Sequence, residues 1–191
     1  MCLMNLMDVG RMKEVSISET GYAREINVKD MDRPYGNMEL TQERKLSPEQ
    51  KAEVREETGW SNEIVDSIGS MEEFRIYQDA GVIEAQIGEK KCLIRPDIDM
   101  SQKDGFGRTN KERMEQGLAP LTPEGRPYEL HHIGQHQDSP LAELTMQEHR
   151  GKGNDTILHI KTKVSEIDRE EFGFERAQHW QDRADEVNEH E

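Results

Sequence analysis

From residue 46 onward, short runs of mixed polar and apolar residues are bounded by a serine at one end and a glycine at the other. The runs cover residues 47–59, 61–69 and 70–81. Serine is a favoured N-cap and glycine a favoured C-terminal stop, so the pattern predicts three short helices. In the first run, Pro48 suits the first helical position and Gln50 suits a capping box.

Two β-rich runs around a glycine-containing turn follow, in the segment VIEAQIGEKKCLIR at residues 82–95. They predict a β-hairpin. With the three helices, this hairpin predicts a small α+β unit over residues 46–98. The apolar side chains expected to fill its core are Trp60, Ile64, Ile68, Phe74, Ile76, Ile83 and Ile87.

Beyond residue 98 the chain is rich in turn-forming residues, with one helix predicted at 109–117. The segments YELHHI and SPLAELT, at residues 128–133 and 139–145, suit two short strands. A helix then begins at Thr145, with Glu148 three residues later as a capping-box partner. Two glycines soon interrupt it.

Residues 165–190 predict a closing helix, with Trp180 in the core and His179 on the surface. Its partly amphipathic face consists of Ile167, Phe172, Phe174, Ala177, Trp180 and Val187. Residues 1–45 have few branched apolar side chains and predict an irregular linker or arm. The expected organisation is therefore this arm, the unit at 46–98, and a third region at 99–191.

Composition and charge limit what this chain can be. It has 191 residues and a formal net charge of −15, and Leu, Ile, Val and Phe make up just under a fifth of it. That balance lies at the edge of the disordered range, so a modest core and substantial loose chain are expected. Residues 101–164 have no net charge, whereas both flanks are acidic. Charge alone therefore argues against nucleic-acid binding.

Neither the cysteines nor the first residues indicate export through a membrane. Cys2 and Cys92 lack the paired spacing of a disulfide framework or a zinc ribbon. The start MCLMNLMDVG has no basic region followed by a long apolar one, and no window is apolar enough for a membrane span. We expect cytoplasmic synthesis without a signal peptide.

Histidines gather in one part of the sequence: five of the seven lie between His131 and His159. His131 and His132 are adjacent in a predicted strand, so their side chains should point to opposite faces. A division of labour is expected, in which one histidine binds a metal and its neighbour activates water. His149 and His159 can complete a ligand set that suits zinc, nickel or, with waters, magnesium.

The segment GRTNKERMEQGLAP, followed by ELHHIGQ and then SPLAELTMQEHRGKGNDTILH, resembles the LHH family of HNH/endonuclease VII-type nucleases. Such modules are common at the C-terminal end of bacterial polymorphic toxins. The similarity covers about residues 99–160, and the segment from residue 46 to residue 81 resembles what often precedes them. The resemblance implies an α+β fold with a ββα-metal (His-Me finger) core, beside the upstream helical and hairpin unit and the C-terminal helix.

The resemblance also implies roles for the histidines. His131 matches a metal ligand and His132 the general base, while His149 and His159 match further ligands. Many HNH nucleases place their last two ligands one helical turn apart, whereas these two are ten positions apart. Asn154 therefore competes with His159 for the last ligand position.

Basic residues around the histidines are the expected phosphate contacts. They are Arg108, Lys111, Arg113, Arg150 and Lys152. Arg113 could equally be a helix-surface charge, and Arg150 and Lys152 could merely favour the end of a short helix. Glu129 is either the partner of a histidine or a solvated strand carboxylate. His136, in a loop beside the histidine pair, is expected to face solvent.

Together, these features predict a metal-dependent DNA endonuclease in which His132 takes a proton from the attacking water. The expected cofactor is one divalent ion: zinc, magnesium, nickel or manganese. By resemblance, the chain is a toxin or effector module that a dedicated system exports into target cells and a cognate immunity protein neutralises. The alternatives are a ribonuclease on the same scaffold and a non-catalytic binding protein stabilised by a metal.

Overall fold

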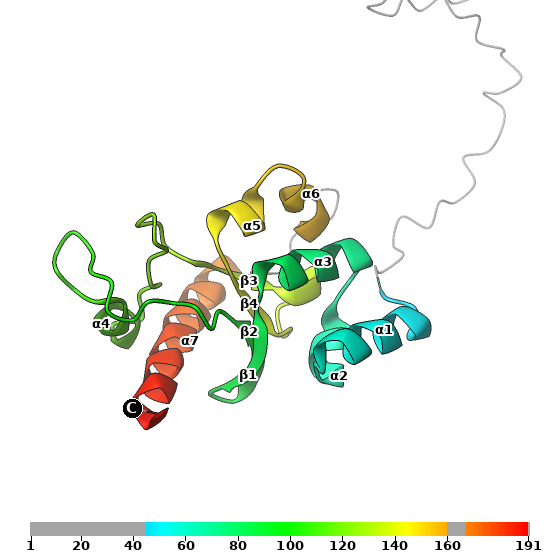
Figure 1. Ribbon diagram of the computed structural model, residues 1–191, viewed down its shortest axis with the longest axis horizontal. Helices are drawn as coiled ribbons and strands as arrows, with labels where there is room; N and C mark the ends of the chain where they lie inside the picture. The colour runs from blue at the N-terminus through cyan, green and yellow to red at the C-terminus, as the bar shows by residue number, and fades with distance from the viewer. Residues whose placement is uncertain (1–44, 160–166, 191) are drawn as a thin grey trace, which may run out of the picture. The chain divides into compact units, whose positions relative to one another are not determined.

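The computed structural model describes residues 45–159 and 167–190. The predicted arm at residues 1–45 lies outside this part, except for its last residue. The described chain has an α+β fold (Figure 1). In chain order its elements are α1 (Pro48–Thr58), α2 (Asn62–Ser67), α3 (Met71–Ala80), β1 (Ile83–Ile87), β2 (Lys90–Ile94), α4 (Asn110–Glu115), β3 (Glu129–His132), a 3-10 turn (Ile133–Gln135), β4 (Leu141–Leu144), α5 (Met146–Arg150), α6 (Asn154–Leu158) and α7 (Arg169–His190).

The capped helices form where the sequence predicts them. The side chains of Ser47, Ser70 and Thr145 each accept a hydrogen bond from the backbone N–H three residues later. Helix α1 ends at Gly59, which has a φ of 72° in the left-handed region that glycine adopts without strain. Helix α2 is shorter than expected because it ends before Ile68.

The four strands form one mixed sheet with the order β1-β2-β4-β3. The hairpins β1–β2 and β3–β4 are antiparallel, and they join through a parallel pairing of Leu93 in β2 with Ala142 in β4. The upstream hairpin therefore extends the sheet that carries the histidines. Strands β3 and β4 followed by α5 form the ββα arrangement that the resemblance implies.

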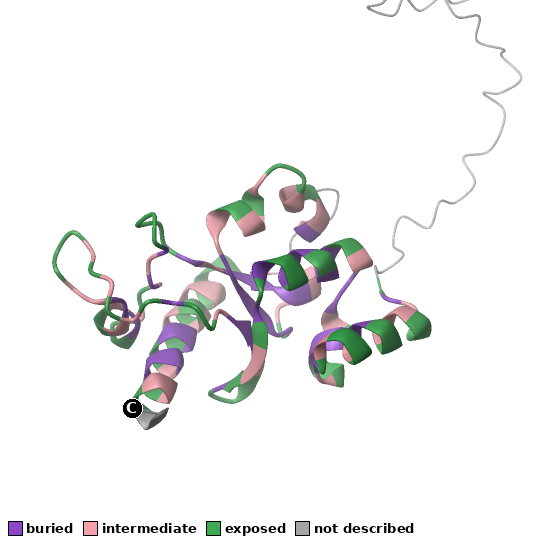
Figure 2. Cartoon of the chain, viewed as in Figure 1, coloured by how far each residue is buried: buried purple, intermediate pink, exposed green. Residues whose placement is uncertain are grey.

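Both faces of the sheet are covered, and the buried residues lie along the strands and the inner sides of the helices (Figure 2). One apolar cluster joins α1, α2 and α3 to Leu93, Leu144 and Leu158. The other joins Trp180 and Ala184 of α7 to the opposite face. The upstream helices and the closing helix thus complete the core on the two faces of the sheet.

The prediction that His179 lies on the surface is wrong. His179 is buried, and its Nε2 lies 2.9 Å from Oε1 of Glu143, a fully buried carboxylate of β4. Arg183 donates to the same oxygen, and Arg95 donates its backbone N–H to the other. Burial also raises the pKa of the neighbouring Cys92 thiol to about 12. A polar network thus attaches α7 to the sheet.

Two apolar side chains expected in the core are exposed instead. Ile83 is 48 % exposed because β1 is an edge strand, and Phe174 is 73 % exposed on the outer side of α7. Helix α6 was not predicted: it begins directly after Gly153, which has a φ of 96°. Among the described helices, none has the length and apolar character that a membrane span requires.

Candidate metal centre and active site

Strand β3 presents its two adjacent histidines to opposite faces of the sheet. Glu129 and His131 both contact His149 of α5 on one face. On the other face, the ring of His132 packs against Phe172 of α7, with 4.5 Å between the ring centroids. The prediction that His131 and His132 point different ways is confirmed.

Three histidines converge on the α5 face from three elements: His131 from β3, His149 from α5 and His159 from the residue after α6. Nε2 of His149 lies 3.2 Å from Nδ1 of His131 and 3.2 Å from Nε2 of His159. The fold thus brings together the three residues that the sequence predicted as metal ligands. They are called the histidine triad below.

A carboxylate fixes the orientation of His149. Nδ1 of His149 lies 2.8 Å from Oε2 of Glu129, and Arg150 holds both oxygens of that carboxylate. Because a carboxylate accepts, Nδ1 carries the proton and Nε2 presents its lone pair to the triad. Of the two interpretations of Glu129, the structure shows the one in which it is the partner of a histidine.

His159 is oriented in the same manner by its own helix. Its Nδ1 lies 3.1 Å from the carbonyl oxygen of Asp155 and 3.1 Å from Oδ1 of the same residue. Nε2 therefore faces the triad. Asn154 donates its side-chain amide to the carbonyl of Glu148, 2.8 Å away, and braces the loop between α5 and α6. The geometry favours His159 over Asn154 as the third ligand.

Burial favours the neutral form of two triad members, His131 and His149. It lowers the pKa of His131 well below its ordinary value, and the neighbouring histidines add to this effect. The pKa of His149 is lowered too, chiefly by burial, although Glu129 opposes the shift. A neutral imidazole offers a lone pair, which is the form that binds a metal.

The donor set fits one divalent ion. Two nitrogens bound to a tetrahedral zinc at the usual bond length are separated by roughly 3.3 Å. The two distances of 3.2 Å from Nε2 of His149 to the nitrogens of His131 and His159 are close to this separation. A three-histidine set also leaves a coordination position for water or substrate, as catalytic sites require.

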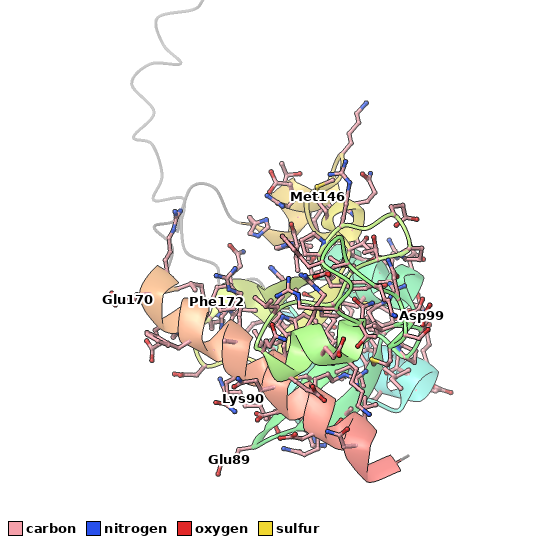
Figure 3. The ribbon with its side chains drawn as sticks, turned by 90° about the vertical axis from the view of Figure 1, so that its left-hand side faces the viewer. Glu89, Lys90, Asp99, Met146, Glu170 and Phe172 are labelled. Carbon is pink, nitrogen blue, oxygen red and sulfur yellow. The ribbon has the colours of Figure 1, made fainter. Side chains whose placement is uncertain are left out.

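His132 is bound to α7. Its Nε2 lies 2.8 Å from Oε2 of Glu175, and the residue is 3 % exposed. Burial raises the pKa of Glu175, but hydrogen bonds from His132 and Lys90 outweigh burial, so that pKa is lowered. Figure 3 shows α7 running across this side of the protein, with Phe172 in its first half. Sequence analysis missed Glu175, because one carboxylate in an acidic helix carries no signal.

Most of the predicted phosphate contacts have internal partners. Arg108 and Arg113 both bind the carboxylate of Asp104. Desolvation raises the pKa of Asp104, but the hydrogen bonds to its oxygens together outweigh desolvation and hold that pKa well below its ordinary value. Arg113 also donates to the carbonyl of Ala119. These arginines, with Lys111, lie on or beside α4, in a segment braced by its own contacts.

Two further basic residues lie at the end of α5, close in sequence to His149. Arg150 is more than half exposed while it binds Glu129, and Lys152 is exposed. His136 is exposed in its loop, as predicted.

A comparison with known protein families finds a similarity for the segment that carries the histidines. Residues 109–186 match the model of LHH, described as a nuclease of the HNH/ENDO VII superfamily with conserved LHH. The match includes β3, β4, α5, α6 and most of α7. No solved structure matches the chain. Residues 109–186 of this chain are therefore similar to the LHH family of the HNH/ENDO VII nuclease superfamily.

Proposed function

We propose that this protein is a metal-dependent endonuclease that hydrolyses phosphodiester bonds in DNA. The observation that carries the proposal is the histidine triad, whose ring nitrogens converge on one point, with His132 directly after His131 in sequence. The family supports a nuclease, and a three-imidazole set supports metal dependence. His131, His149 and His159 would hold the ion.

Once bound, a divalent ion at this position would supply Lewis-acid stabilisation of the negative charge that develops on the phosphate. Imidazole ligands suit zinc and nickel, whereas magnesium or manganese would bind with additional waters.

His132 is the proposed general base, and Glu175 determines which of its nitrogens can act. The carboxylate accepts a hydrogen bond from Nε2–H of His132, 2.8 Å away, which leaves Nδ1 without a proton and able to accept one. Because His132 is 3 % exposed, the first turns of α7 must shift for a water molecule to reach its ring. Glu175 would therefore hold the base ready, and α7 would control access to it.

The observations in favour of a phosphate contact differ among the five proposed basic residues. Arg150 and Lys152 lie closest in sequence to His149 and are exposed, although Arg150 would have to exchange Glu129 for phosphate. Arg108 and Arg113 would first have to exchange Asp104 for phosphate. Nothing in these contacts reads a base edge, so weak sequence preference is expected.

We also propose a biological role as an antibacterial toxin or effector module, exported into target cells and neutralised by a cognate immunity protein. This role is supported by the resemblance of the LHH segment to polymorphic-toxin modules. The direct test is to look for a small protein that binds this chain with high affinity and abolishes its cleavage of nucleic acid.

Cleavage of supercoiled plasmid by the purified chain, with and without a chelator, tests the enzymatic proposal. We expect nicking that chelation abolishes and an added divalent ion restores. Single-stranded and duplex RNA are offered in parallel, and cleavage of RNA alone would replace the DNA endonuclease with a ribonuclease. Metal binding without cleavage of either polymer would favour a non-catalytic binding protein.

A further inference from the structure

The histidines of the triad share one feature beyond their convergence. In His149 and His159, the ring nitrogen that points away from the triad contacts a carboxylate, Glu129 at 2.8 Å and Asp155 at 3.1 Å. Such outer carboxylates fix the tautomer and the orientation of a metal-binding histidine. Two of the three ligands therefore have their outer support already in place.

In His131, the ring nitrogen that points away from the triad has no such carboxylate partner. It points Nδ1 toward the triad, and its Nε2 is buried without a hydrogen-bond partner among the described residues. The residue is 4 % exposed, so solvent does not readily reach that nitrogen. A buried imidazole N–H without an acceptor destabilises the folded protein, because it has lost its hydrogen bond to water.

A carboxylate stands in front of this nitrogen. Oε1 of Glu73 lies 4.0 Å from Nε2 of His131. This distance is too long for a hydrogen bond, but the two groups are close enough to attract each other electrostatically. Glu73 comes from α3, which precedes residues 109–186, the segment that matches the nuclease family. It is the third carboxylate on the outer side of the triad.

The position of Glu73 is fixed by three donors. Its oxygens accept hydrogen bonds from the backbone N–H groups of Gly69 and Gly134 and from the hydroxyl of Tyr77. The carboxylate is 4 % exposed. Gly134 directly follows the strand that carries the histidine pair, so Glu73 ties α3 to the end of β3.

Metal binding would determine the proton position in His131. A neutral imidazole carries one proton, so coordination through Nδ1 requires Nε2 to carry it. That N–H then points at Glu73, and closing the gap to a normal hydrogen bond needs a movement of roughly 1 Å.

We propose that Glu73 is a positioning residue for His131: it accepts the Nε2–H of His131 when the triad holds its ion. The proposal rests on the proposed function, because it assumes that the triad binds a metal. It makes the upstream helix α3 part of the metal centre.

The test is zinc affinity of the chelator-stripped full chain carrying Glu73→Gln, measured by calorimetric titration. Loss of an outer partner typically weakens metal binding about 10–100-fold. We expect a loss of about tenfold for Glu73→Gln, since the amide oxygen can still accept a weaker hydrogen bond. The matched control is Glu143→Gln, another buried carboxylate, whose partners Arg183 and His179 lie on the α7 face. It should lower stability and leave zinc affinity unchanged.

A second readout uses the parent chain and so does not depend on the folding of a variant. In proton–nitrogen NMR spectra of the zinc-loaded chain, Nε2–H of His131 should give a slowly exchanging resonance shifted downfield by a carboxylate acceptor. If that proton is absent or exchanges rapidly, or if Glu73→Gln binds zinc as tightly as the parent, the Glu73 assignment is overturned. Should the parent bind no divalent ion at all, the proposed function falls with it.

Discussion

At the scale of single residues, the two adjacent histidines differ in their partners. His131 belongs to the triad, whereas His132 is held by Glu175 and Phe172 on the other side of the sheet. A ligand and a base can therefore be separated by mutation, because each side chain contacts a different set of groups.

We predict that His132→Ala lowers cleavage about a hundredfold or more, which is typical for loss of a general base, while metal affinity stays near that of the parent. Plasmid nicking and calorimetric titration of the same preparation measure the two quantities. His136→Ala, an exposed histidine in the adjacent loop, is the control and should behave as the parent. Near-parental nicking by His132→Ala would end the assignment of the base.

A second pair of variants addresses the third ligand. His159→Ala should weaken metal binding and cleavage together, because Nε2 of His159 faces the triad. Asn154→Ala should affect metal affinity less, because its amide binds the carbonyl of Glu148. Titration of both variants with zinc decides between them, and the reverse order of effects would make Asn154 the ligand.

Residue identities could be predicted from the sequence more reliably than residue partners. The motif around His131 and His149 carries the ligand types, and the period of a strand separates His131 from His132. Glu129 as the partner of a histidine was one of two open alternatives, and Asp155 contacts His159 within one helical turn of an unpredicted helix. The partners Glu73 and Glu175 depend on contacts between elements, and an acidic chain offers many equivalent carboxylates. His179 was assigned to the surface for the same reason: its partner Glu143 lies 36 positions away.

At the scale of elements, the first half of α7 carries the side chains that contact the proposed base. If Glu175 fixes the proton on Nε2 of His132, Glu175→Ala should lower kcat roughly tenfold to a hundredfold, part of what a general base contributes. KM should change little, because Glu175 faces His132 and Lys90 rather than a free surface. Steady-state cleavage of a short duplex measures both constants.

The control for this experiment is Glu171→Ala, an exposed carboxylate one turn earlier in α7. Its kcat should match that of the parent. Faster cleavage by Glu175→Ala would contradict the positioning role, and would show instead that α7 mainly covers His132.

Helix boundaries can be predicted from nearby residues, whereas the pairing of strands in the sheet cannot. Capping residues act on the backbone within three positions, so α1, α3 and α5 could be predicted from Ser47, Ser70 and Thr145. Pairing of β2 with β4 joins residues almost fifty positions apart, and no short pattern specifies it. The sequence therefore predicted each hairpin, but it did not predict that the two hairpins form one sheet.

At the scale of the whole molecule, the described fold shares its apolar clusters between the upstream segment and the family segment. We predict that residues 46–191 alone keep the fold and the activity, whereas residues 99–164 fold poorly. The shorter piece loses β1 and β2, the helices α1 to α3 and the Trp180 contacts of α7. Limited proteolysis with mass spectrometry tests this, and a stable, active fragment that begins near residue 99 and lacks α7 would refute it.

If one divalent ion, held by the histidine triad, is required for cleavage, activity must follow the occupancy of that site. Plasmid nicking is measured for the chelator-stripped full chain as a divalent ion is added back in fractions of an equivalent. We expect no nicking before addition and full nicking near one equivalent, with no restoration in His149→Ala. Nicking by the stripped chain that no added ion changes would show that the triad's ion is not needed for cleavage.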